Sequence, residues 1–161
     1  MKVNTRMRRY LADLRSREVG AAAVPAAPAI HIVEASGLVL LRGFVQKPHG
    51  TLAEFPNETA LECTANRLRM ESMVEPRLAR SAPLLLLTAG LVTAGAMALA
   101  LRKLKGSFNV IVSYDGEGCA VRFHKIRAAQ RWLMNNLEDY EGEGILVFEA
   151  GPEQPAPMLL G

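Results

Sequence analysis

Hydrophobic and polar residues alternate most regularly in the second half of the chain. The alternation runs on both sides of the tetrad Asp-Gly-Glu-Gly at 115–118, a pattern typical of two strands joined by a tight turn. The apolar positions are Phe108, Val110 and Val112 before the turn and Cys119, Val121 and Phe123 after it. A third strand is predicted for the run ILVFE that follows Gly144.

Between these strands, apolar residues recur at three- and four-residue spacing, which predicts a helix from about Lys125 to Tyr140. Residues 104–150 are therefore expected to form a ββαβ unit. In this unit Ile126, Leu133 and Leu137 should pack on the sheet face that carries Val110, Val112 and Val121.

A similar order is predicted for residues 30–80. Two β-rich runs flank a turn at 34–37, and Asn57 is placed to cap a helix that starts at Glu58 and ends before Pro76. The expected fold class is therefore α+β, with two small hairpin-plus-helix units, the second of them ββαβ, flanking a long apolar helix.

The N-terminal residues 1–19 predict a short basic amphipathic helix. Its apolar face would carry Met7, Tyr10, Leu11 and Leu14. Its other face would carry candidates for contact with nucleic acid or with a membrane surface, namely Arg6, Arg8, Arg9, Arg15 and Arg17. Residues 20–29 form an Ala/Pro tract without charge, which is typical of a linker. The last residues, 151–161, are Pro-rich and are expected to be a flexible tail.

The strongest single signal is the apolar segment at 81–103, which has no charged residue between Ser81 and Leu101 and no polar stripe. About 20 helical residues extend about 30 Å, the thickness of the hydrocarbon core of a bilayer. The other elements are short, and their apolar faces are committed to their neighbours, so they offer little to surround such a helix. We therefore predict a transmembrane span. The alternatives are a buried helix in a soluble domain and a helix covered by other subunits.

Small residues within this segment suggest how it could associate. Gly90, Ala94 and Ala98 recur at four-residue spacing, which lets a second helix approach closely. Self-association or docking on another membrane helix would follow. Positive charge flanks both ends of the segment, and the N-terminal Arg-rich helix favours an N-terminus on the cytoplasmic side of the membrane.

Composition and charge narrow the possible functions. The 161 residues are 50% hydrophobic and 22% charged, which excludes a disordered protein, and the net charge of +3 is only a mild basic bias. His31, His49 and His124 are scattered, and no nucleophile can be paired with a base from the sequence. We accordingly predict no enzyme, no metal site and no cofactor.

The charges of the predicted C-terminal helix run against its dipole. Acidic residues lie near its end, and basic ones near its start. The basic group, a candidate anion-binding site, is His124, Lys125, Arg127 and Arg131. The alternative is a solvated charged face with a purely structural role.

Together these patterns predict a non-enzymatic, single-pass membrane protein that acts as a structural or assembly module. Its partners would be other proteins or further copies of itself, reached through the apolar helix, and the lipid bilayer. The alternative is a soluble or particle-associated structural protein, cytoplasmic or within a particle, whose Arg-rich N-terminal arm swings on the linker and contacts nucleic acid.

Overall fold

The computed structural model describes residues 1–16, 26–42, 52–155, 157 and 159. Within them the chain has a mixed α+β fold with two β-sheets and four α-helices. The helices are α1 (Thr5–Ser16), α2 (Glu58–Ala65), α3 (Pro76–Ser81) and α4 (Leu84–Leu101). The strands are β1 (Lys2–Val3), β2 (Ile32–Ala35), β3 (Leu38–Leu41), β4 (Leu68–Arg69), β5 (Phe108–Tyr114), β6 (Cys119–Lys125) and β7 (Gly144–Ala150). Short 3-10 turns are η2 (Leu52–Glu54), η3 (Met70–Ser72) and η4 (Leu137–Asp139).

The main sheet is antiparallel, in the order β1-β7-β5-β6-β4. The predicted β5–β6 hairpin and the strand β7 are confirmed. Asp115 holds the hairpin turn, because its Oδ1 accepts hydrogen bonds from the backbone N–H groups of Glu117 at 2.9 Å and Gly118 at 2.7 Å. The edge strands come from elsewhere: β1 from the N-terminus and β4 from the first half. One sheet therefore joins the two predicted units.

The second sheet is the predicted hairpin of β2 and β3, which is also confirmed. Its turn places Ser36 and Gly37 at φ of 52° and 78°, a region in which glycine costs nothing. Buried side chains of the α2 region attach the hairpin to the body. The N–H of Val39 donates to Glu62 Oε1 at 2.9 Å, and that of Leu41 donates to Asn66 Oδ1 at 2.8 Å.

Helix α2 begins as predicted and ends earlier than predicted. Asn57 Oδ1 accepts the N–H of Ala60 at 2.9 Å, which confirms the N-cap. The helix ends at Ala65 because Asn66 leaves the helical conformation, and its side chain bonds to β3. Leu68, which lies within the range predicted for the helix, instead belongs to β4.

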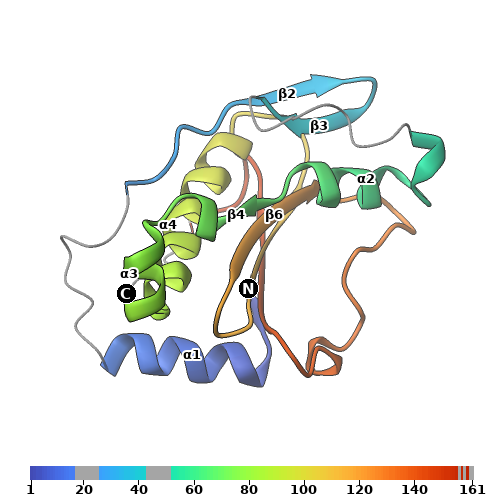
Figure 1. Cartoon of the computed structure of the whole chain (residues 1–161). Coiled ribbons are helices and arrows are strands. Elements are labelled where there is room, and N and C mark those ends of the chain that lie inside the picture. Colours follow the sequence, from blue (N-terminus) through green and yellow to red (C-terminus); the bar gives the residue numbers. More distant parts are fainter. Residues whose placement is uncertain (17–25, 43–51, 156, 158, 160–161) are drawn as a thin grey trace.

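The predicted apolar helix is confirmed as α4, which runs along one face of the main sheet (Figure 1). Among the described residues, it is the one helix long and apolar enough to cross a membrane by length and composition, and 67% of it is buried inside the protein. The main sheet supplies the cover that short amphipathic elements could not. In this fold α4 is a core helix.

The three small residues of α4 at four-residue spacing are covered by the rest of the protein, and Gly90 lies against the sheet. Gly90, Ala94 and Ala98 are buried, and a Cβ atom added to Gly90 would collide with the Sγ atom of Cys119 on β6. The close approach at Gly90 is therefore made to strands of the same chain. A second helix could not reach them while α4 stays on the sheet.

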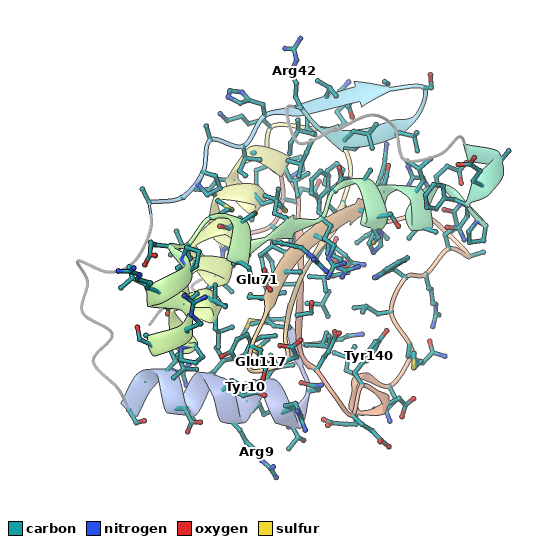
Figure 2. The ribbon with its side chains drawn as sticks, viewed as in Figure 1. Arg9, Tyr10, Arg42, Glu71, Glu117 and Tyr140 are labelled. Carbon is teal, nitrogen blue, oxygen red and sulfur yellow. The ribbon has the colours of Figure 1, made fainter. Side chains whose placement is uncertain are left out.

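Helix α1 is confirmed and is docked on the body, so the expected swinging arm is wrong for the described part. Met7 is fully buried. Asn4 Oδ1 accepts the N–H groups of Met7 and Ile145, both at 2.9 Å, which fixes the helix start to β7. The arginines Arg6, Arg8, Arg9 and Arg15 are exposed, and Arg9 points away from the body (Figure 2). Arg17 and residues 20–25 of the predicted linker lie outside the described residues.

The helix predicted from Lys125 to Tyr140 is wrong. Residues 126–143, here called the covering loop, hold only the 3-10 turn η4. Ala129 adopts a φ of 61°, which no α-helix allows, and the reversed charges would also oppose a helix here. The covering loop lies on the opposite side of the main sheet from α4 (Figure 1).

Candidate functional site

The two faces of the main sheet differ in their cover. Along each strand, side chains point alternately toward α4 and toward the covering loop. We call the side of the sheet under the covering loop the loop face. Among the residues on the loop face are Asn109 and Ile111 of β5 and Arg122 and His124 of β6, which pair as Asn109–His124 and Ile111–Arg122. This face carries the candidate site, because its cover is irregular and leaves polar groups accessible.

A buried ion pair fixes the start of the covering loop. Arg127 donates to both carboxylate oxygens of Glu62, at 2.7 and 2.9 Å, and to the carbonyl of Gly37 at 2.9 Å. Glu62 is fully buried and also accepts the N–H groups of Val39 and Lys125. The hydrogen bond to Glu62 raises the pKa of Arg127. The charge of this arginine is therefore already neutralised within the protein.

The rest of the covering loop packs on a small second core. Its apolar side chains Trp132, Leu133, Leu137 and Tyr140 contact a buried cluster made of Cys63, Ile111, Ile145 and Val147. Leu133 and Leu137 therefore pack on the loop face, and the expected packing on Val110, Val112 and Val121 is wrong. Those valines line the core that contains α4. Ile126, expected to be buried, is 40% exposed. Tyr140 lies on the loop side of the sheet (Figure 2).

A cleft of about 560 Å³ opens between the covering loop and the loop face. Its polar floor is a row across three strands, since Asn109 of β5 is the register partner of both His124 and Glu149. Trp132 lines the cleft from the covering loop. Three cationic residues, Lys2, Arg127 and Arg131, also line it.

The buried His124 sets the hydrogen-bond pattern of this floor. Its Nδ1 lies 2.9 Å from the carbonyl oxygen of Lys125, which can only accept, so Nδ1 carries the hydrogen. Its Nε2 then accepts from Asn109 Nδ2 at 3.4 Å. Burial lowers the pKa of His124, although the Lys125 carbonyl and the Glu62 carboxylate favour the charged form. The imidazole is therefore neutral at pH 7.

Three of the four predicted anion-site residues reach the cleft, namely His124, Arg127 and Arg131. Lys125 does not line it, because alternation along β6 directs this side chain to the opposite face, where it lies beside Gly106. Arg131 is exposed and donates a hydrogen bond to Asn135 Oδ1. The helix dipole invoked for this site is absent, since the segment forms no α-helix.

A second cationic group on the loop face was missed in the sequence. Arg67 and Arg69 flank Leu68, whose register partner is the core-facing Val121, so both arginines lie on the same face as Arg122. Within the described part of the chain, none of these guanidinium groups makes a hydrogen bond or an ion pair. The signal was present as the alternation Arg-Leu-Arg at 67–69 and Val-Arg-Phe at 121–123.

We call Arg67, Arg69 and Arg122 the arginine cluster, and the positive charges of Arg67 and Arg69 act on Arg122. Burial, and next the positive charge of Arg67, lower the pKa of Arg122. The Cζ atom of Arg122 lies 5.7 Å from the ring centroid of Trp132, a cation–π distance. Trp132 therefore borders both the arginine cluster and the cleft.

Groups suited to covalent or metal chemistry do not gather on the described residues. No three His, Cys, Asp or Glu side chains there are placed to hold one metal ion. Cys63 and Cys119 are buried free thiols, and burial raises the pKa of each. The arrangement favours binding through charge, stacking and hydrogen bonds.

Comparison with known proteins adds one finding. No curated protein and no solved structure matches the chain. The model of the uncharacterized protein PM0498 family matches residues 2–155, so the chain belongs to that family.

Proposed function

We propose that this protein is a non-enzymatic binding module that holds single-stranded nucleic acid on the loop face. The observation that carries the proposal is the arginine cluster, in which three guanidinium groups share one face and make no salt bridge among the described residues; Glu143 is the nearby acidic residue that partly offsets the charge of Arg122. Arg122 is half-buried, so its charge is kept in a partly desolvated place. An anionic partner would offset that cost.

The side-chain chemistry supports phosphate as the group that is bound. Arginine presents a planar fork of donors that matches phosphate oxygens, and it is held ready for two parallel hydrogen bonds. Arg67 and Arg69 are two residues apart on an extended strand, about 6.6 Å along its axis. Neighbouring phosphates of an extended single strand could thus be contacted separately.

Aromatic groups beside the cluster favour nucleic acid over an acidic peptide. Proteins that bind single strands combine a basic surface with aromatic rings on which bases stack. Trp132 is half-buried next to Arg122, and Tyr140 follows on the same covering loop. An acidic peptide would use the arginines and leave the rings without a role.

A direct binding measurement tests the proposal. We would titrate the full chain into a labelled ten-nucleotide single strand, follow fluorescence anisotropy, and repeat the titration at several salt concentrations. Arg67→Ala/Arg69→Ala should weaken binding at least about tenfold. It should also reduce the magnitude of the slope of log K against log salt concentration by about 1.4, because two phosphate contacts are lost.

The matched control removes the same charge elsewhere. Arg77→Ala/Arg80→Ala alters two exposed arginines of α3, which contacts α4 on the other side of the sheet. Its affinity should stay within about twofold of the parent. Equal losses in the two double variants would reduce the effect to net charge, and absence of binding by the parent would end the proposal.

A single-pass membrane protein that acts by assembly is the second candidate, favoured by the length and composition of α4. The same residues fill the core, so insertion would require α4 to leave the sheet and expose Val110, Val112 and Phe123. Alkaline carbonate extraction of membranes tests this candidate. A spanning protein stays in the pellet, whereas a protein that keeps α4 in its core is released.

A further inference from the structure

We propose that the cleft is a nucleobase pocket that selects bases with an exocyclic amino group, adenine above all. The inference rests on the proposed function, since it assigns a base-reading role to the space next to the arginine cluster. The base could belong to a bound strand or to a free nucleotide.

The size and walls of the cleft suit a flat ring. Its volume of about 560 Å³ lies within the range of small-molecule sites. Trp132 and Leu133 of the covering loop contribute stacking and apolar surface to its lining. Because Trp132 lines the cleft and its ring centroid lies 5.7 Å from the Cζ atom of Arg122, the cleft and the arginine cluster are neighbours on the loop face.

The floor offers a fixed hydrogen-bond pattern. Lys125 holds the hydrogen of His124 on Nδ1, so Nε2 must accept, and the Asn109 side chain must turn its NH₂ group toward it. This fixes the amide against a flip. The Oδ1 atom and the second N–H of Asn109 have no partner among the described residues and are available to a ligand.

That pattern matches adenine. An asparagine amide can accept from the 6-amino group of adenine through its oxygen and donate to the ring N7 through its nitrogen. The neighbouring Glu149 is an exposed carboxylate, which can accept a further amino hydrogen. Thymine and uracil carry a carbonyl at the corresponding position, so they lose both amino-group hydrogen bonds and keep at most the one that the free N–H of Asn109 can donate; they should therefore bind more weakly.

The cationic residues at the cleft divide into two groups. Arg127 is committed to Glu62 and is not available. Lys2 and Arg131 form no ion pair among the described residues. Both line the cleft, so they are the cationic groups left to pair with the phosphate of a bound nucleotide.

The only tryptophan of the chain is Trp132, so intrinsic fluorescence reports directly on this site. We would titrate the full chain with oligo-dA and oligo-dT of ten nucleotides and with AMP and UMP. Oligo-dA should bind about tenfold tighter than oligo-dT, and AMP should quench the tryptophan emission at concentrations where UMP does not.

Two variants test the residues that read the base. Asn109→Ala should reduce the preference for oligo-dA to within about twofold of oligo-dT and leave the salt dependence unchanged. Glu149→Gln should weaken the preference without destabilising the fold, since Glu149 is exposed. The exposed Glu141, whose replacement by Gln changes the same charge, serves as the control.

The outcomes separate this inference from the proposed function. Equal, salt-dependent binding of oligo-dA and oligo-dT would overturn the pocket and leave the arginine cluster as the nucleic-acid surface. AMP binding that depends on Asn109, without binding of any strand, would overturn the proposed function and keep the pocket for a free nucleotide. If neither the strands nor AMP bind, both are overturned.

Discussion

The same strands of the main sheet bear two unlike surfaces. On one side α4 covers a continuous apolar layer in which Val110, Val112 and Phe123 are fully buried. On the loop face, the covering loop leaves Trp132 and Leu133 half-buried above a small core. A regular helix can close a face completely, whereas a loop pinned at separate points leaves gaps, and here the gaps hold the cleft and the arginine cluster.

We expect the core under α4 to stabilise the fold and the loop face to provide binding. The core around α4 draws on nearly every element of the chain, while the loop-face core holds four buried residues. The covering loop depends instead on polar anchors, chiefly the ion pair of Arg127 with Glu62. Changes on the two faces should therefore have different consequences, which can be measured.

The largest effect is expected for the anchor itself. Glu62→Gln should lower the free energy of unfolding by about 3–5 kcal/mol, because it removes the negative charge of the buried pair and leaves Arg127 without its counter-charge. Chemical denaturation measures the loss. Glu62→Gln/Arg127→Met should recover part of it, since no lone charge then remains. If the double variant is less stable than the single one, the cost does not arise from the unpaired arginine.

The next largest effect is expected for a substitution in α4, and it tests whether α4 is a core helix. Leu91 is 1% exposed and Leu99 is 53% exposed. Leu91→Ala should cost about 2–5 kcal/mol, and Leu99→Ala less than about 1 kcal/mol, because only the first substitution leaves a cavity. Thermal unfolding of the two variants provides the comparison. Equal losses would mean that α4 is not held on the sheet as described.

Local signals in the sequence were reliable where one short-range interaction decides the structure. The Asp115 turn, the Asn57 cap and the alternation in β5 and β6 depend on residues within a few positions of each other, and all three are confirmed. The apolar helix was also located correctly. The surroundings of this helix were not predicted, because the sheet that covers it is built from strands of both halves of the chain, and no local pattern indicates that these strands pair.

The covering loop shows what local pattern could not supply. Its helical spacing of apolar residues was real, but its conformation is set by distant partners: Arg127 bonds to Glu62, and Gln130 bonds to Thr59 and Glu58. These contacts join residues more than sixty positions apart. Likewise, Arg67 and Arg122 meet only because β4 pairs with β6. The candidate site is therefore a product of the tertiary fold.

A smaller effect is expected within the loop-face core. Leu133→Ala should cost about 1–2 kcal/mol, less than a fully buried leucine, because Leu133 already contacts solvent. Hydrogen exchange should show the same contrast between the faces, with amides of the covering loop exchanging faster than those of α4. Protection of the covering loop equal to that of α4 would remove the distinction between the two covers.

The smallest effect is a pH dependence of the free energy of unfolding, which we expect to arise from His124 on the loop face. Burial lowers the pKa of His124 in the folded protein, so the unfolded chain takes up the proton first as the pH falls. Below the ordinary histidine pKa of about 6.5, the unfolded state therefore binds more protons, and stability declines with falling pH until the folded pKa is passed, by at most about 1.4 kcal/mol per pH unit. Denaturation between about pH 7 and pH 5 should show this slope in the parent. His124→Gln should flatten it, and replacement of the exposed His31 by Gln should not. If the slope survives in His124→Gln, another group on the sheet is responsible, and the buried imidazole does not distinguish the loop face from the face under α4.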